Sequence, residues 1–171
     1  MNAPANERKL FWLLSGVIGG LCLAYFWPHE PAYAMATDRD ARFAICTVPV
    51  SPASPDAVFV LDFLTGRLTG ALLNMQSATF TNFWFANVAE DFKIPGKGDK
   101  SKFTIIPGNG FLNAAAGGGG ETPSLGLIYV AEMTSGKVGC YTFHFRNQMQ
   151  PSEPMRLEPV NYFLFREERA K

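Results

Sequence analysis

Neither sign of charge is in excess in this chain, and that absence excludes one class of partner. The 171 residues include 15 Lys and Arg against 15 Asp and Glu, which leaves no formal net charge. Proteins that capture nucleic acid present a basic surface that releases counterions from the phosphate backbone. We therefore expect no nucleic-acid partner.

Cysteine and histidine are also scarce, with three and two copies respectively. Neither a Cys-x-x-Cys nor a His-x-x-x-His spacing, both typical of zinc sites, occurs in the sequence. His144 has no Ser or Cys in a nucleophile motif that it could activate. We expect no metal, no cofactor and no enzymatic activity. The enzymatic alternative is a carboxylate acid and base drawn from Asp62, Asp91 and Glu132.

Only one long apolar run occurs, LFWLLSGVIGGLCLAYF at 10–26, and it follows Arg8 and Lys9. Its seventeen residues are near the lower limit for a spanning helix and exceed the usual core of a cleaved signal peptide. The basic pair favours a cytoplasmic N-terminus. We predict a cytoplasmic segment 1–9, a transmembrane signal-anchor helix 10–27 and a periplasmic or otherwise extracytoplasmic remainder.

Three details of this region bear on that interpretation. AYA at 32–34 has the small residues that a signal peptidase favours, so cleavage after Ala34 is the alternative to a retained anchor. Gly16 and Gly20 form a G-x-x-x-G pair that either brings two helices together or is only tolerated in a span. Cys22 lacks the preceding small residue of a lipoprotein box, so we interpret it as an apolar filler.

After Met35 the chain consists of short apolar runs broken by Gly, Pro, Asn and Asp, which is typical of strands and turns. No segment there has a sustained helical period with start and stop signals. With 47% apolar and 13% aromatic residues, the chain can pack the core of one domain. We predict a mostly β domain.

This β region contains one pattern twice: a basic residue and a first strand, then a hairpin, then an Asn followed by an aromatic-rich strand. The matching segments are RFAICTV at 42–48 with KFTIIPG at 102–108, VFVLDFLTGRL at 58–68 with IYVAEMTSGKV at 128–138, and NFWFANV at 82–88 with NYFLFRE at 161–167.

The repeat predicts a duplicated four-strand antiparallel meander of blade-like units. The first unit covers 42–91 and the second covers 102–171, with linkers at 28–41 and 92–101. The alternative is that the two meanders pack face to face as a two-sheet β-sandwich.

Each hairpin has the residues of a tight turn. Gly66 and Gly136 supply the positive φ that a type I turn with a G1 bulge requires. Asp62 can accept hydrogen bonds from backbone N–H groups of its turn, and the hydroxyls of Thr65 and Ser135 can do so more weakly. Glu132 stands at the position of Asp62 in the second copy, and we interpret both acids as structural turn residues.

These hairpins resemble those of quinoprotein-type (PQQ-like) β-propeller repeats, in which a strand ending in Leu-Asp passes through a Thr-Gly turn into the next strand. The resemblance covers the two hairpins and implies a blade-like meander. It carries over no quinone site, because the cofactor-binding side of that family is not visible here. The chain also resembles a group of uncharacterised short single-span bacterial envelope proteins.

The strands are apolar on both faces. Val58 and Val60 point to one side while Phe59 and Leu61 point to the other. Such strands need cover above and below, and two units cannot close a propeller, which takes about four to eight blades. We therefore expect a homo-oligomer, or assembly with another envelope protein.

Two further features have open interpretations. Cys46 and Cys140 both lie in expected strands of an extracytoplasmic domain, so they either form a disulfide or stay as buried thiols. The segment NGFLNAAAGGGGETPS at 109–124 is a Gly-rich loop without the Lys-Ser/Thr of a phosphate loop. It could fold over a partner.

From these observations we expect a non-catalytic, membrane-anchored extracytoplasmic β domain that acts in envelope structure or protein–protein assembly. The alternative is a small-molecule or sugar-binding module in which the Gly-rich loop 109–124 serves as a flexible lid.

Overall fold

The computed structural model describes residues 5–26, 37–93, 102–110, 112 and 120–166. It divides into two compact parts, Met1–Tyr33 and Ala34–Lys171. The AYA sequence at 32–34 and half of the Gly-rich loop 109–124 lie outside the described residues.

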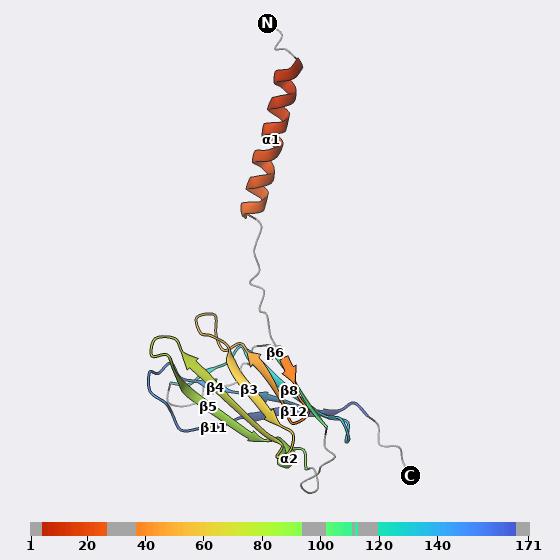
Figure 1. The fold of residues 1–171 in the computed structure, drawn as a ribbon, viewed down its shortest axis with the longest axis vertical. Coiled ribbons are helices and arrows are strands. Elements are labelled where there is room, and N and C mark those ends of the chain that lie inside the picture. Colours follow the sequence, from red (N-terminus) through yellow and green to blue (C-terminus); the bar gives the residue numbers. More distant parts are fainter. Residues whose placement is uncertain (1–4, 27–36, 94–101, 111, 113–119, 167–171) are drawn as a thin grey trace. The chain divides into compact units, whose positions relative to one another are not determined.

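The N-terminal part contains helix α1 (Ala5–Phe26), so a helix is present where one was expected over 10–27, although position 27 lies outside the described residues (Figure 1). Its large apolar side chains are exposed, among them Trp12, Ile18 and Leu23. Within the described residues, no helix combines the length and the hydropathy that crossing a bilayer requires. The membrane-spanning property of this segment therefore gains no support from the structure and stays a prediction.

The C-terminal part, Ala34–Lys171, is built mainly from strands, which confirms the prediction of a mostly β domain. Its first sheet has the strand order β1-β2-β3-β4-β5-β11, and all pairs are antiparallel except the last. The strands are β1 (Thr37–Arg39), β2 (Phe43–Val48), β3 (Ala57–Asp62), β4 (Arg67–Asn74), β5 (Thr79–Asn87) and β11 (Met155–Arg156). A short helix, α2 (Val88–Asp91), follows β5 and is capped by the Asn87 side chain.

The second sheet has the order β12-β9-β8-β6 and is antiparallel throughout. Its strands are β6 (Phe103–Asn109), β8 (Gly126–Glu132), β9 (Lys137–Thr142) and β12 (Glu158–Leu164). A separate two-stranded ribbon pairs β7 (Thr122–Pro123) with β10 (His144–Phe145). Each predicted unit thus contains one four-strand meander, β2-β3-β4-β5 or β6-β8-β9-β12 (Figure 1).

The two sheets share one hydrophobic core. An aromatic cluster lies inside it, where the ring of Phe143 is 5.0 Å from that of Phe59 and 4.8 Å from that of Trp84. The sheets approach each other along the first strand of each four-strand meander, β2 and β6. They do not close into a propeller, so the blade-like expectation is corrected to two sheets packed on a common core, the arrangement that the sandwich alternative describes.

Strand pairing shows how closely the two meanders correspond. Phe43 pairs with Asp62 as Phe103 pairs with Glu132. One step later Asp62 pairs with Arg67, as Glu132 pairs with Lys137. The residues 43, 62 and 67 therefore have structural equivalents at 103, 132 and 137.

The last strand of each unit corrects the sequence alignment. The sequence pattern aligns Asn82 with Asn161. In the structure Gly70 and Cys140 occupy equivalent positions, because they pair with the equivalent residues Phe59 and Tyr129. Gly70 also pairs with Trp84, and Cys140 also pairs with Asn161. Trp84 is therefore the equivalent of Asn161, a difference of two residues. Next to the turn the pairing runs without a shift in both units, from Arg67 with Asn87 to Leu72 with Asn82 and from Lys137 with Leu164 to Cys140 with Asn161. The two asparagines of the sequence motifs therefore stand at different places in their strands.

The equivalent faces of the two meanders lie in opposite environments. Phe59 and Leu61 are buried in the first sheet, while their equivalents Tyr129 and Ala131 lie on the outer side of the second sheet. The reverse holds for Val130, which is buried although its equivalent Val60 lies on the outer side. The two units are thus stacked front to back.

Candidate functional site

The turn between β3 and β4 is held by the carboxylate of Asp62. It accepts hydrogen bonds from the backbone N–H of Leu64 and from the hydroxyl of Thr65, each at 2.8 Å. The hydrogen bond from Thr65, together with those from the turn backbone, lowers the pKa of Asp62 below its usual value although partial burial acts in the opposite direction. These hydrogen bonds keep the Asp62 carboxylate within its own turn.

The turn between β8 and β9 uses Glu132 in the same position, with a longer side chain. Its carboxylate accepts hydrogen bonds from the backbone N–H groups of Thr134 and Ser135. Burial raises the pKa of Glu132, but these hydrogen bonds outweigh it and the net pKa lies below the usual value. Glu132 is only 1% exposed, so this acid belongs to the protein interior.

The glycine that ends each turn has the expected positive φ, +67° at Gly66 and +73° at Gly136. A Cβ on Gly66 would lie 2.5 Å from the Cβ of Ala89, and one on Gly136 would lie 2.4 Å from the Cβ of Arg166. The chain therefore passes close to the turn at equivalent places in both units. Only glycine satisfies both the dihedral and the close approach.

The carboxylates considered as catalytic candidates are used separately. Asp62 and Glu132 each serve their own turn. Asp91 accepts a hydrogen bond from the hydroxyl of Tyr141 at 3.1 Å and lies 3.3 Å from the guanidinium of Arg156. Burial raises the pKa of Tyr141 well above its usual value, and the nearby Asp91 carboxylate acts in the same direction. This group links α2 to the second sheet and to β11, which is a structural role.

The outer faces of the two sheets are mainly apolar and partly exposed. On the first sheet, cross-strand neighbours on the outer face are Ile45, Val60, Thr69 and Phe85 in one row and Thr47, Val58, Ala71 and Phe83 in the next. On the second sheet they are Ile106, Tyr129, Cys140 and Asn161, then Thr104, Ala131, Val138 and Phe163. We call these the first outer face and the second outer face.

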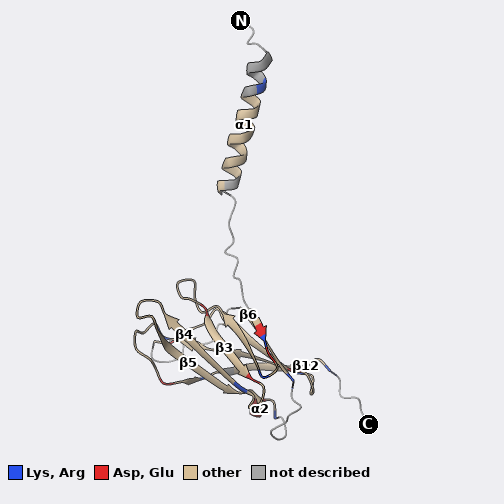
Figure 2. Ribbon diagram, in the orientation of Figure 1, with Lys and Arg blue, Asp and Glu red and all other residues tan. Residues whose placement is uncertain are grey.

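No residue of these rows is charged. Figure 2 shows the central strands almost entirely in the colour of uncharged residues. Ile106 is 55% exposed and Phe163 is 60% exposed on the second outer face, and Ile45 is 38% exposed on the first. Contiguous apolar surface of this kind is typical of interaction sites.

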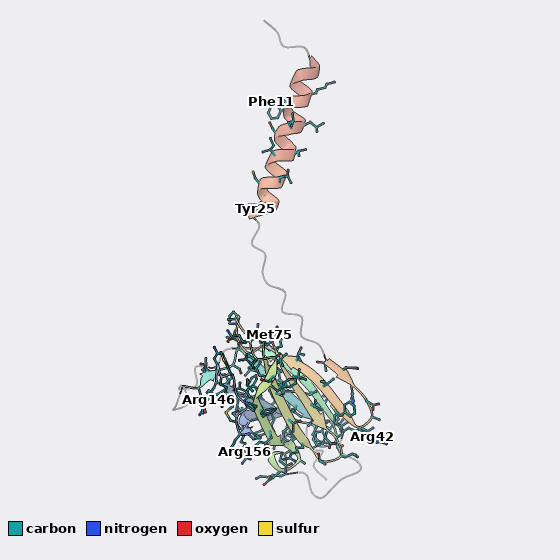
Figure 3. All side chains as sticks on the ribbon, turned by 60° about the vertical axis from the view of Figure 1, so that its left-hand side comes forward. Phe11, Tyr25, Arg42, Met75, Arg146 and Arg156 are labelled. Atoms are coloured by element: carbon teal, nitrogen blue, oxygen red, sulfur yellow. The ribbon has the colours of Figure 1, made fainter. Side chains whose placement is uncertain are left out.

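A cleft of about 240 Å³ lies where the connections between strands meet, and we call it the loop-end cleft. Its polar lining includes Ser51, Asn74, Gln76, Asn82 and Arg146. Figure 3 labels Met75 and Arg146, which both line it. Amides and hydroxyls converging on one concave site are typical of a pocket for a polar small molecule.

Two buried or half-buried amides fix the shape of the loop-end cleft. Asn82 exchanges two 3.0 Å hydrogen bonds with the backbone of Arg146, and Asn74 donates one to the carbonyl of Gln148. The side chain of Arg146 forms a 2.7 Å ion pair with Glu121, which comes from the end of the Gly-rich segment. The described end of that segment is thus fastened to the cleft wall.

Of the two interpretations left open for Cys46 and Cys140, the structure has the free thiols and no disulfide between them. Cys46 lies in the core, where burial raises its pKa to about 12. Cys140 lies beside Tyr129 on the second outer face, and burial raises its pKa as well. The thiol of Cys46 extends from the first sheet into the core, whereas that of Cys140 lies on the outer face of the second sheet. The second sheet therefore separates the two thiols.

The remaining candidate residues of the sequence are Gly16, Gly20, Cys22 and His144. Gly16, Gly20 and Cys22 lie in α1, and among the described residues no side chain or other chain segment lies within 4 Å of where a Cβ would stand on either glycine. The backbone carbonyl of His144 accepts a hydrogen bond from the indole of Trp84 at 2.8 Å. Its Nε2 is buried and has no hydrogen-bond partner in the part of the chain that the structure describes.

No family model matches this chain, and no match was found among curated proteins or solved structures. The resemblance of the hairpins to quinoprotein-type repeats therefore stays a prediction. Within the described ranges, no group of three or more His, Cys, Asp and Glu side chains is placed to hold a metal ion.

Sequence reasoning missed the loop-end cleft and the residues that shape it. Asn82 gave a usable signal, because a polar amide inside an aromatic-rich strand needs a hydrogen-bond partner when it is buried. The ion pair between Glu121 and Arg146 gave none, since it joins residues 25 positions apart across two irregular connections.

Proposed function

We propose that this protein is a non-catalytic β domain for protein–protein assembly, anchored at a membrane through its N-terminal helix. One observation carries the assembly part: both sheets have mainly apolar, partly exposed outer faces with no charged residue in their central rows. A domain that only needed to fold would gain solubility from charges at these positions. Surfaces that bind another protein surface keep them apolar.

The membrane part of the proposal rests on the sequence of the helix. The run at 10–26 has no charge and follows two basic residues. A helix that is apolar on all sides needs a nonpolar environment, and the basic flank favours a cytoplasmic N-terminus. This would place the β domain in the periplasm or another extracytoplasmic compartment, where it acts in envelope structure.

Topology tests this address. A reporter that is active only outside the cytoplasm, fused after Lys171, should be active in cells that carry the full chain. Mass spectrometry of the native protein should find the first thirty residues attached. A cytoplasmic C-terminus would overturn the address, and a mature protein beginning at Met35 would replace the anchor with a cleaved signal.

Charge substitutions on the outer faces test the assembly part. Ile106→Lys places a charge on the edge strand β6 of the second outer face, whereas Leu64→Lys places one at an exposed turn outside both faces. Affinity purification from solubilised membranes should recover a partner with the wild type and with Leu64→Lys, and lose it with Ile106→Lys. Equal recovery with all three proteins would show that the apolar face has no role in assembly.

The loop-end cleft supports a second candidate function, binding of a sugar or another polar small molecule. The observation in its favour is the concave site with converging amides and hydroxyls, fastened to the Gly-rich segment through Glu121 and Arg146. Calorimetric titration with a set of monosaccharides and disaccharides tests it. Binding should weaken in Gln76→Ala, which alters the cleft lining, and not in Gln150→Ala, an exposed control. Absence of binding to the whole set would remove sugars as the ligand class.

A further inference from the structure

We propose that the protein stacks head to tail on copies of itself, with the second outer face of one copy covering the first outer face of the next. This inference rests on the proposed function in assembly and specifies the partner as a second copy of this chain. It follows from the way in which the two meanders of a single chain already pack.

The contact inside the chain serves as the template. It joins the inner face of the first sheet, which includes Phe59 and Leu61, to the inner face of the second sheet, which includes Ile105 and Val130. Because the units are stacked front to back, these two inner faces are not equivalent positions of the repeat. The contact is heterologous, like the contact between successive members of an array.

Each outer face is the equivalent of one partner in this contact. The second outer face carries Ile106, Tyr129 and Ala131, whose equivalents in the first sheet are the core residues Cys46, Phe59 and Leu61. The first outer face carries Ile45 and Val60, whose equivalents in the second sheet are the core residues Ile105 and Val130. The exposed faces therefore continue an interface that the chain has already formed once.

The template also predicts which strands would meet. Inside the chain, the sheets approach each other along the first strand of each meander, β2 and β6. Carried to the next interface, the outer side of β6 in one copy would lie against the outer side of β2 in the other. Ile106 and Thr104 would then face Ile45 and Thr47.

Charges at the rim are compatible with this stacking. The first outer face ends at the pair Asp62 and Arg67, whose equivalents in the second sheet are Glu132 and Lys137. In the internal contact Lys137 is accommodated with its Nζ 4.5 Å from the centre of the Tyr162 ring. A charged pair at this end therefore does not prevent two faces from packing.

Single charge substitutions on each face give a test that separates head-to-tail from other modes of association. The test uses the full chain in mild detergent and measures protein mass by light scattering after correction for bound detergent. Ile106→Lys disrupts the second outer face and Ile45→Lys disrupts the first. The charges have the same sign, so they cannot compensate each other where the two positions face. The variant that carries both substitutions gives the baseline for any association through α1.

The wild type should associate beyond this baseline. Each single variant alone should fall to the baseline, because it retains only one of the two unlike faces. An equimolar mixture of the two variants should form a one-to-one pair and nothing larger, since one intact interface can form between them. Phe163→Lys and Thr69→Lys, on the second and first outer faces, repeat the experiment at other exposed positions in case Ile45→Lys disturbs folding.

Three outcomes would overturn the inference: a wild type at the baseline, a single variant that still pairs with itself, or a mixture that stays at the baseline while the wild type associates. Self-pairing of one variant would indicate contact between like faces. A wild type at the baseline that nevertheless recovers a membrane partner dependent on Ile106 would leave the proposed function standing without self-stacking. Loss of both results would remove the two together.

Discussion

The two meanders of this domain have the same strand order and the same hairpin pairing, yet they bury opposite faces. Phe59 is fully buried, whereas its equivalent Tyr129 is 37% exposed. Asp62 is partly exposed, whereas its equivalent Glu132 lies in the interior. The local pattern therefore sets strands and turns, while the position in the stack decides which side of each sheet becomes core.

The difference also explains why the outer surfaces are apolar. A repeat in which either face can become core keeps both faces apolar, as seen in the stretch Val58 to Leu61 of β3. In one chain only half of these faces are used. The remaining halves are the surfaces on which the proposed assembly depends.

The largest expected effect comes from breaking the core on one side of the comparison. Phe59→Ala should lower the free energy of unfolding by about 3–5 kcal/mol, because it leaves a cavity beside Trp84 and Phe143. Tyr129→Ala, at the equivalent position on the outer face, should lower it by less than about 1 kcal/mol. Urea denaturation of both variants measures the difference. Equal losses would show that the two faces do not differ in burial as described.

The turn glycines should instead behave alike. Gly66→Val and Gly136→Val each force a β-branched residue to positive φ and place its Cβ against a neighbouring backbone. Each should lower the free energy of unfolding by about 1–3 kcal/mol. The corresponding substitution at Gly16, where nothing lies near the Cβ position, should not affect the β domain. Strongly unequal effects at the two turns would contradict their structural equivalence.

Substitution of the two turn acids should again lower the free energy of unfolding unequally in the two units, with a smaller difference than at Phe59 and Tyr129. Glu132→Ala removes a buried carboxylate that accepts hydrogen bonds from the backbone N–H groups of Thr134 and Ser135, and should lower the free energy of unfolding by about 1–3 kcal/mol. Asp62→Ala should cost clearly less, because water can replace the carboxylate in a partly exposed turn. Thermal denaturation of both variants at neutral pH gives the comparison. A larger loss for Asp62→Ala would contradict the assigned burial.

Several parts of this structure could be predicted from sequence for identifiable physical reasons. Gly66 and Gly136 indicated their turns because positive φ restricts the residue type. The acids at 62 and 132 marked the strand ends next to them. The β class followed from short apolar runs between turn residues.

Other parts could not be predicted because they depend on distant contacts. Alternation in Val58 to Leu61 cannot show which face is buried when both faces are apolar. The parallel pairing of β11 with β5 depends on the path of the irregular segment 146–154 between β10 and β11. The loop-end cleft depends on three connections that meet only after folding. The choice between a Cys46–Cys140 disulfide and two free thiols stayed open in the sequence because it depends on which side of its sheet each thiol faces.

The smallest expected effect is a difference in acid sensitivity between the two turns. Asp62 and Glu132 both have a pKa in the folded state below the usual value. Each carboxylate therefore adds stability that is present above its unfolded-state pKa, about 4 for both types, and is lost as the pH falls through the folded-state value.

The wild type should accordingly keep its urea midpoint from about pH 7 to pH 5 as far as these two groups are concerned, and lose stability below about pH 4. Glu132→Gln should remove more of this acid-side loss than Asp62→Asn, because the Glu132 carboxylate is buried among backbone N–H groups while that of Asp62 is screened by solvent. The measurement is the urea midpoint of the wild type and both variants at pH values from 7 to 3. If Asp62→Asn removes the larger share, burial is not what distinguishes the two turns, and the hydrogen bond from Thr65 outweighs it.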